Sequence, residues 1–244
     1  LGVIHVIMFS PEDLSLIKNG PKDRRRFIDI ELSQLNGVYF HYLQQYHRLL
    51  KQRNALLKDC QRKPSHDNRE QLDIWDIQVV HYGAKVIEIR DDFIRDLNII
   101  YKKRHFDISG GQELMDLKYD KNVSLDDYED KLKKAQDKDI RFGSTSVGPH
   151  RDDLLFDLNG VDLRKYGSQG QQRTAALSLK LSEIDLVIER RDENPVLLLD
   201  DVLSELDANR QSYLMEHLDG IQTFITCTGV EDFIKKDFDN KLFL

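Results

Sequence analysis

The chain has 244 residues, enough for one large or two ordinary domains, and its 40% hydrophobic and 32% charged residues exclude a disordered chain. No apolar run approaches the ~18 residues of a membrane helix, and residues 1–9 lack the features of a signal peptide. Cys60 and Cys227 have no second ligand at metal-binding spacing, which excludes a structural zinc or a disulfide framework and favours a cytoplasmic location.

Charge is distributed unevenly along the chain. The formal net charge of −7 argues against a protein that coats nucleic acid indiscriminately. Residues 17–63, however, hold eleven Lys and Arg against four Asp and Glu. The average therefore hides a basic stretch.

Residues 1–27 begin with a predicted strand over residues 3–9. Ser10-Pro11 then has the composition of a helix start, with Ser as the N-cap and acidic residues in the first turn. Asn19-Gly20-Pro21 ends that short helix. Because a strand opens the chain and no initiator Met precedes it, we expect the chain to be a fragment of a longer protein.

Residues 28–109 carry the clearest periodicity. Apolar residues spaced four and three apart run from Ile28 to Leu49 and, after a polar turn near Pro64, from Leu72 to Phe93. Arg53 interrupts the first stripe. Two such helices joined by a short turn must pack antiparallel, either within an ordinary bundle or as an arm that projects from a globular head. We favour the arm, because little other hydrophobic sequence is available to surround the two helices.

Residues 110–244 alternate predicted strands and helices. Asn159-Gly160 between two apolar runs, 153–158 and 161–164, predicts a β-hairpin. A long helix over 171–190, a buried strand over 196–201, a helix from about Ala208 and a strand over 223–226 follow. This order implies right-handed crossovers and a parallel sheet with helices on its faces.

Two short segments in this block carry chemistry. Asp200 and Asp201 end the buried strand, and the carboxyl edge of a parallel sheet is where open α/β sheets bind ligands. The stretch Ser168-Gln169-Gly170-Gln171-Gln172 opens the long helix, whose N-terminal amides can bind an anion. Each segment also has a plain alternative: two acids that cap a turn, and a Ser N-cap with a glycine turn.

Taken together, the order of these motifs resembles the head of an ATP-binding-cassette protein, with a signature motif, a Walker B strand and a D-loop. Within that superfamily the chain resembles the RecF family of bacterial recombination-repair proteins over essentially its whole length. The resemblance rests on several blocks, which are Pro11-Glu12-Asp13-Leu14, Arg24-Arg25-Arg26-Phe27, Gly148-Pro149-His150-Arg151-Asp152-Asp153, Tyr166-Gly167-Ser168-Gln169-Gly170-Gln171-Gln172-Arg173-Thr174 and Leu197-Leu198-Leu199-Asp200-Asp201-Val202-Leu203-Ser204-Glu205-Leu206-Asp207. It implies an α/β ATPase head lobe with an inserted antiparallel helical-hairpin arm, in which residues 1–27 end the first lobe, 28–109 form the arm and 110–244 form the second lobe.

The resemblance also assigns roles. Asp200 would bind the Mg²⁺ that accompanies ATP, and Asp201, where most cassettes have Glu, would polarise the attacking water. The helix start would meet the γ-phosphate of ATP held by a second subunit, through Ser168, Gln169, Gly170 and Gln171. Asp207 would communicate across this dimer, and Thr228 lies at the switch position.

A P-loop is missing, because none of the thirteen glycines is followed by Lys. We therefore expect the chain to be a carboxyl-terminal portion that does not hydrolyse ATP by itself, although the full-length protein would be a weak DNA-stimulated ATPase. Candidate contacts to DNA lie in the basic stretch and are Arg24, Arg25, Arg26, Lys51 and Arg53. A solvated charged helix face is the alternative for these clusters.

The resemblance further implies ATP-driven homodimerisation at junctions of single- and double-stranded DNA. It implies work with RecO and RecR in loading RecA, and a part in replication restart and the SOS response, with no membrane contact. Two other classes share the head motifs. A transporter cassette has a much shorter helical insert, and a chromosome-maintenance clamp has a coiled coil that runs for hundreds of residues, whereas this one turns back at Pro64.

Overall fold

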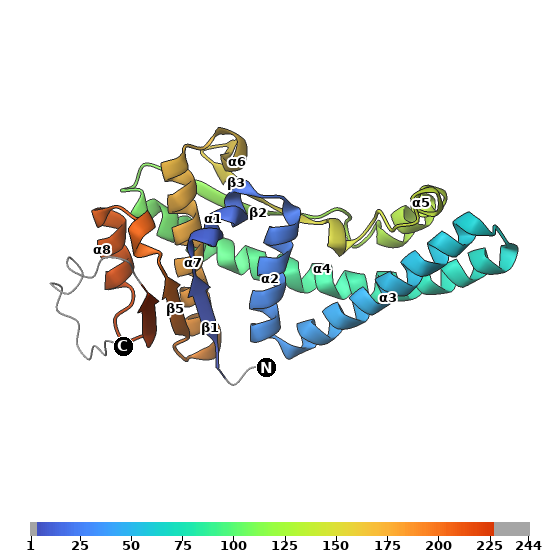
Figure 1. The fold of residues 1–244 in the computed structure, drawn as a ribbon, viewed down its shortest axis with the longest axis horizontal. Coiled ribbons are helices and arrows are strands. Elements are labelled where there is room, and N and C mark those ends of the chain that lie inside the picture. Colours follow the sequence, from blue (N-terminus) through green and yellow to red (C-terminus); the bar gives the residue numbers. More distant parts are fainter. Residues whose placement is uncertain (1–3, 227–244) are drawn as a thin grey trace.

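A computed structural model describes residues 4–226 of the chain (Figure 1). The elements in chain order are β1 (Val6–Phe9), η1 (Pro11–Asp13), α1 (Leu14–Lys18), α2 (Pro21–Leu35), α3 (Gly37–Arg62), α4 (His66–Ile108), β2 (Met115–Asp120), α5 (Tyr128–Phe142), η2 (Pro149–Arg151), β3 (Asp153–Leu158), β4 (Val161–Asp162), α6 (Leu163–Tyr166), α7 (Gln169–Arg191), β5 (Val196–Asp200), η3 (Leu203–Glu205), α8 (Ala208–Glu216) and β6 (Thr223–Thr226). No helix within residues 4–226 is long and apolar enough to cross a membrane.

A parallel sheet with the strand order β1-β5-β6 holds the predicted chemistry. β5 is the central strand. Leu197 and Leu199 on one of its faces are buried, whereas Val196 and Leu198 on the other face are half-buried, so the strand is fully covered on one face only. β1 begins at Val6 in the structure, whereas the sequence predicted the strand from residue 3, which lies outside the described residues. Figure 1 shows α7 beside β1 and β5, so that this long helix covers one face of the sheet.

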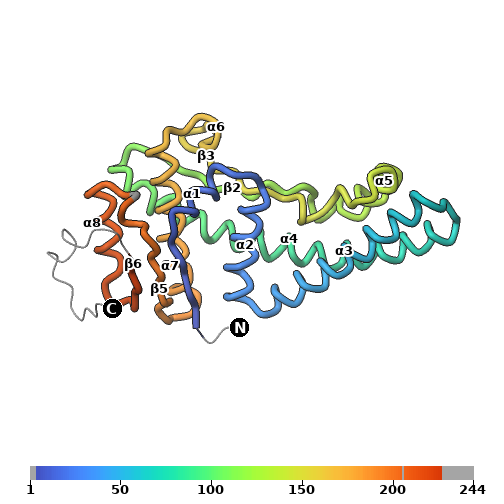
Figure 2. The backbone as a smooth tube through the Cα atoms, viewed as in Figure 1, coloured from blue at the N-terminus to red at the C-terminus, as the bar shows by residue number. Residues whose placement is uncertain are grey.

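The predicted antiparallel hairpin is formed by α3 and α4. Tyr39 meets Arg90 across it, Tyr46 lies against Gly83, and Arg53 meets Asp76. The residue numbers of each pair add to 129, which places the centre of the hairpin between Pro64 and Ser65. In Figure 2 this tip projects away from both sheets, with α5 beside the hairpin.

The first predicted heptad helix is in fact two helices. The apolar spacing from Ile28 to Leu49 predicts one helix, but α2 ends at Leu35 and α3 begins at Gly37. Asn36 separates them, and its side chain accepts hydrogen bonds from the backbone N–H groups of Val38 and Tyr39. An Asn in extended conformation at this position is a strong N-cap and therefore starts a new helix.

A second sheet, antiparallel with the order β2-β3-β4, packs against α4. Its β3-β4 turn is the predicted Asn159-Gly160 hairpin, and both residues have a positive φ, 52° and 86°, as a two-residue turn of this hand requires. The second strand of the hairpin is shorter than expected, because the chain enters α6 at Leu163.

Two hydrophobic clusters form the core, and α7 contributes to both. Ala175 and Leu179 belong to the cluster that contains the hairpin helices and the antiparallel sheet. Leu177 and Leu181, on the other side of the same helix, belong to the cluster around β1, β5 and α8. Because both sides of α7 are buried, the position of its N-terminus is fixed relative to both sheets.

Candidate functional site

The two predicted carboxylates lie at the carboxyl edge of the parallel sheet. Asp200 is the exposed last residue of β5, and one of its oxygens accepts a hydrogen bond of 2.6 Å from Thr226 Oγ1 on the neighbouring strand. Asp201 has a left-handed backbone, with φ 50°, and donates its backbone N–H to the carbonyl of Thr226 at 3.1 Å. The two side chains thus stand at one sheet edge as the sequence predicts, and Thr226 orients the first of them.

The predicted signature segment caps α7. Ser168 Oγ accepts a hydrogen bond from the backbone N–H of Gln171 at 3.2 Å, and the side chain of Gln171 accepts one from the backbone N–H of Ser168 at 2.9 Å. This reciprocal pair satisfies two of the amides at the helix start. Ser168, Gln169 and Gly170 are exposed, so the end of the helix is open to an outside anion. Gln171 is occupied, because its amide also donates to Glu113 at 2.9 Å.

Gly167 lies where two helices meet and has a structural role. A Cβ on it would stand 2.4 Å from a methyl carbon of Leu163 and 2.6 Å from the Leu163 carbonyl oxygen. Only glycine fits where the chain passes from α6 to α7. Gly170 is different, since a Cβ there would come no closer than 3.9 Å to Ser168 Oγ, its nearest neighbour.

Asp207 is joined to the signature segment through two side chains. It caps α8 by accepting the backbone N–H of Arg210 at 3.0 Å, and this bond, with the arginine charge, lowers the pKa of its carboxyl. The Arg210 side chain contacts Asp207 and also donates to Thr174 Oγ1 at 2.9 Å and 2.6 Å. Thr174 in turn donates to the carbonyl of Gly170. A continuous polar path therefore connects Asp207 to the start of α7.

Two of the five predicted DNA contacts need correction. Arg24 is 2% exposed and binds both oxygens of Asp153, at 2.6 Å and 3.0 Å. Arg53 is fully buried. Guanidinium groups that pair with carboxylates inside the fold have no surface on which to meet a phosphate. Arg25 is half-buried and donates to the carbonyl of Asp152, and burial lowers the pKa of Arg25. Arg26 and Lys51 are exposed.

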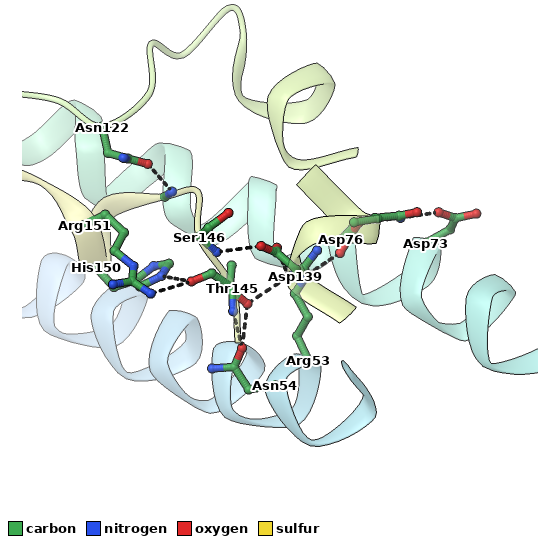
Figure 3. A network of polar contacts seen from close by, with 12 residues as sticks. Arg53, Asn54, Asp73, Asp76, Asn122, Asp139, Thr145, Ser146, His150 and Arg151 are labelled. Atoms are coloured by element: carbon green, nitrogen blue, oxygen red, sulfur yellow. Dashed lines mark hydrogen bonds and ion pairs between the residues drawn. The ribbon is translucent and has the colours of Figure 1, made fainter. Parts of the chain in front are cut away.

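Figure 3 shows the network around Arg53. Its guanidinium donates to Asp76 on α4 at 2.5 Å, to Asp139 on α5 at 2.8 Å and to Thr145 Oγ1 at 2.8 Å. One α3 side chain thereby ties together the two hairpin helices and α5. The sequence contained the signal for this burial, because Arg53 interrupts an apolar stripe and a charged residue in such a stripe faces the core.

A second buried network, around Arg90 and His150, was not predicted from the sequence pattern. Arg90, which is 2% exposed, donates to Asp29, Tyr39 and the carbonyl of Pro149 at 2.7 to 3.0 Å. His150 shares a hydrogen bond of 2.6 Å with Tyr46, and burial lowers the pKa of this histidine to about 4. The Gly148–Asp153 block thus fastens both hairpin helices to β3. Only the resemblance pointed to this block, because its partners in the hairpin, Arg90 and Tyr46, lie more than fifty residues away in the sequence.

Thr228, the predicted switch residue, lies outside the described residues. Within residues 4–226 no hydrogen bond joins the α7 start to Asp200. The structure therefore presents two polar groups on different elements, one at the sheet edge and one at the helix start.

The chain was compared with known protein families, curated proteins and solved structures. No protein-family model matches the chain. It is 54% identical over 237 residues to the DNA replication and repair protein RecF of Agathobacter rectalis, covering 97% of this chain and 65% of that protein. It is 51% identical to the RecF of Lachnospira eligens, covering 99% of this chain and 67% of that protein.

Two solved structures, described as the recombination mediator protein RecF-ATPrS and RecF-ATP in the RecFOR pathway, agree with the fold at a TM-score of 0.88. Each is 39% identical to this chain and covers 95% of it, whereas the chain covers 64% of each. The chain thus spans about two thirds of the length of the relatives that it matches. It belongs to the RecF family of DNA replication and repair proteins.

Proposed function

We propose that this chain supplies the signature helix and the Walker B carboxylates of an ATP site shared between two subunits of a DNA-binding repair protein. One observation carries the proposal. The same chain holds the open, Ser168-capped start of α7 and the carboxylates Asp200 and Asp201 at the edge of a parallel sheet. The solved relatives described with ATP or ATPrS support ATP as the nucleotide.

The residues of this chain supply some of the groups that an Mg²⁺-bound nucleotide needs. Asp200 offers an exposed carboxylate with one oxygen not used by Thr226, and Mg²⁺ takes oxygen ligands of this kind. Asp201 beside it would orient a water molecule, and bound Mg²⁺ would neutralise charge on the phosphates. The backbone N–H groups at the α7 start and the Ser168 hydroxyl would donate to phosphate oxygens of the partner subunit's nucleotide. Without a Gly-Lys pair, the chain has no P-loop to hold a nucleotide of its own.

The path from Asp207 to Gly170 supports communication between two such sites. A displacement of the α7 start moves Thr174 and Arg210, which hold the Asp207 side chain at the exposed start of α8. In a homodimer formed on ATP, each helix start would face the partner, so the aspartate of one subunit would respond to occupancy of the neighbouring site.

DNA is the partner we assign to the whole protein. The relatives' names support action in DNA replication and repair. The exposed side chains of Arg26 and Lys51 could contact DNA phosphates, whereas Arg25 is half-buried. Binding at junctions of single- and double-stranded DNA, weak DNA-stimulated ATP hydrolysis, cooperation with RecO and RecR in loading RecA, and a role in the SOS response belong to this proposal. So does its place in the bacterial cytoplasm.

The test uses a protein that carries this chain together with a P-loop. In Ser168→Arg the new side chain adds bulk and positive charge at the point of closest approach, so ATP-driven dimerisation should be lost while each monomer still binds nucleotide. Asp201→Asn keeps the neighbouring Mg²⁺ ligand but loses the carboxylate that orients water, so ATP-bound dimers should accumulate. Sedimentation velocity with ATP and Mg²⁺ measures both effects.

Ser65→Arg is the matched control, because Ser65 also caps a helix in the same way but lies at the hairpin tip. This variant should dimerise like the unmodified protein. A Ser168→Arg protein that still dimerises on ATP would contradict the shared site. The alternatives of a transporter cassette or a chromosome-maintenance clamp are disfavoured by 51–54% identity to RecF proteins over nearly the whole chain.

A further inference from the structure

The exposed side of α3 carries a line of positive charge. With 3.6 residues per turn, Lys51, Lys58 and Arg62 lie along one line of this helix, and Arg48 flanks it. All four are exposed, and the buried side chains of α3, such as Arg53, lie on the opposite side. The other residues along the central line are not acidic: Gln44, His47 and Ala55. One exposed acid, Asp59, lies on the flank that carries Arg48. We call the four cations with this side of the helix the α3 strip.

The charges of the strip are not used within the fold. No cation of the strip forms an ion pair among the described residues. The cations on the outer side of α4 differ, since most are paired with carboxylates, at distances of 2.8 to 3.0 Å: Arg69 with Asp137, Lys85 with Glu88, Arg95 with Asp92 and Lys102 with Asp116. In a chain of net charge −7, four cations on one helix face that form no ion pair among the described residues, with a single acid beside them, indicate an anionic partner outside the chain.

The end of α5 and the segment that follows it run beside the strip. Asn54 accepts hydrogen bonds from the backbone and the hydroxyl of Thr145, at 2.8 Å and 2.7 Å (Figure 3). Gln61 donates to the carbonyl of Arg141 at 2.8 Å, and Arg151 donates to the carbonyl of Thr145 at 3.1 Å. The exposed Arg141 and Arg151 are thereby held alongside the α3 strip and widen its positive surface.

We propose that the α3 strip, together with Arg141 and Arg151, binds the phosphate backbone of DNA. From Lys51 to Arg62 the helix rises about 16 Å, a length over which one strand of B-DNA carries about five phosphates. The Arg53 network beneath the strip fixes α3 against α4 and α5, so the charges are presented on a rigid surface. An acidic protein is a poorer match, because protein interfaces need apolar or aromatic anchors and the strip has none.

This inference rests on the DNA-binding function proposed above and adds a location to it. The experiment measures fluorescence anisotropy of a labelled duplex with the protein that carries this chain and a P-loop, at several salt concentrations, with and without ATP. Phosphate contacts make the affinity fall linearly with the logarithm of salt concentration, and each lost contact lowers that slope by roughly one. The double variant Lys51→Glu/Lys58→Glu should lower the slope by about two and weaken binding at least about tenfold at low salt.

The control is Lys85→Glu/Lys103→Glu, an equal change of charge on two α4 lysines, the half-buried Lys85, which pairs with Glu88, and the exposed Lys103, that leaves the strip intact. It should retain most of the affinity and the full slope. The milder Lys51→Gln/Lys58→Gln variant, which removes charge without adding any, should also lose slope and guards against misfolding of the first variant. If the strip variants keep the affinity and the salt slope of the unmodified protein, and binding still depends on ATP, the location on the strip is overturned and the proposed function stands.

If the strip variants lose DNA binding but binding by the unmodified protein does not depend on ATP, the location on the strip stands and the proposed ATP-dependent function is overturned. A protein that binds no DNA would overturn both.

Discussion

Replacing Arg53 by Ala tests whether the buried network holds the hairpin together. The substitution removes three hydrogen bonds and leaves the Asp139 carboxylate, which is fully buried, without its cation. Breaking a buried ion pair from one side costs about 3–5 kcal/mol, because the remaining charge stays desolvated. Asp139 keeps a hydrogen bond from the backbone N–H of Ser146, and Asp76 keeps one from Gln136, so we expect the lower half of that range.

The assay is urea unfolding followed by circular dichroism, with the free energy of unfolding obtained by extrapolation to water. A loss of about 3 kcal/mol is a large part of the 5–15 kcal/mol that typically stabilises a domain. Arg48→Ala is the matched control, since this α3 arginine is exposed and has no ion pair among the described residues, and it should change stability by less than about 0.5 kcal/mol.

If Arg53→Ala stays within about 1 kcal/mol of the unmodified protein, the buried ion-pair reasoning is refuted.

Three further results are expected. Gly148→Ala should destabilise the fold by roughly 2–6 kcal/mol in urea unfolding, because φ is 133° there and a Cβ would lie 2.4 Å from the hydroxyl of Tyr128. Gly110→Ala, with φ 68° and open space around it, should cost only about 1–2 kcal/mol. Burial lowers the pKa of His150 from 6.5 to about 4. Between these two pH values the histidine is protonated in the unfolded chain and neutral in the folded state. Stability is therefore lost as pH falls from about 6.5 to 4. In His150→Gln the slope of unfolding free energy against pH should be flatter in that window, and an unchanged slope would exclude this residue as its source. Finally, calorimetric titration of this chain with Mg-ATP should show no sub-micromolar binding, since without a P-loop the phosphates lack their main hydrogen-bond donors. Sub-micromolar binding would contradict the view that tight nucleotide binding needs a P-loop that this chain does not contain.

The sequence alone determined the local elements whose signals lie within a few residues of each other. The heptad spacing predicts the α3–α4 hairpin and its tip near Pro64, because helix faces repeat every three or four residues. Asn159-Gly160 predicts its turn, because few residues other than Asn, Asp and Gly accept a positive φ at both positions. The strand that ends in Asp200 likewise follows from a continuous apolar run.

Only the tertiary structure decided what the charged residues do. Arg24 has the same local appearance as Arg26, yet Arg24 is buried against a carboxylate and Arg26 is exposed. The apolar stripe indicates that Arg53 faces the core, but it does not show which acids Arg53 meets there. The partners of both buried arginines come from other elements: Asp153 lies 129 positions after Arg24, and Asp139 lies 86 positions after Arg53. Whether a cation meets solvent or a buried acid depends on which elements pack against it, and that choice is made by long-range burial of apolar surface, which no short window of sequence contains.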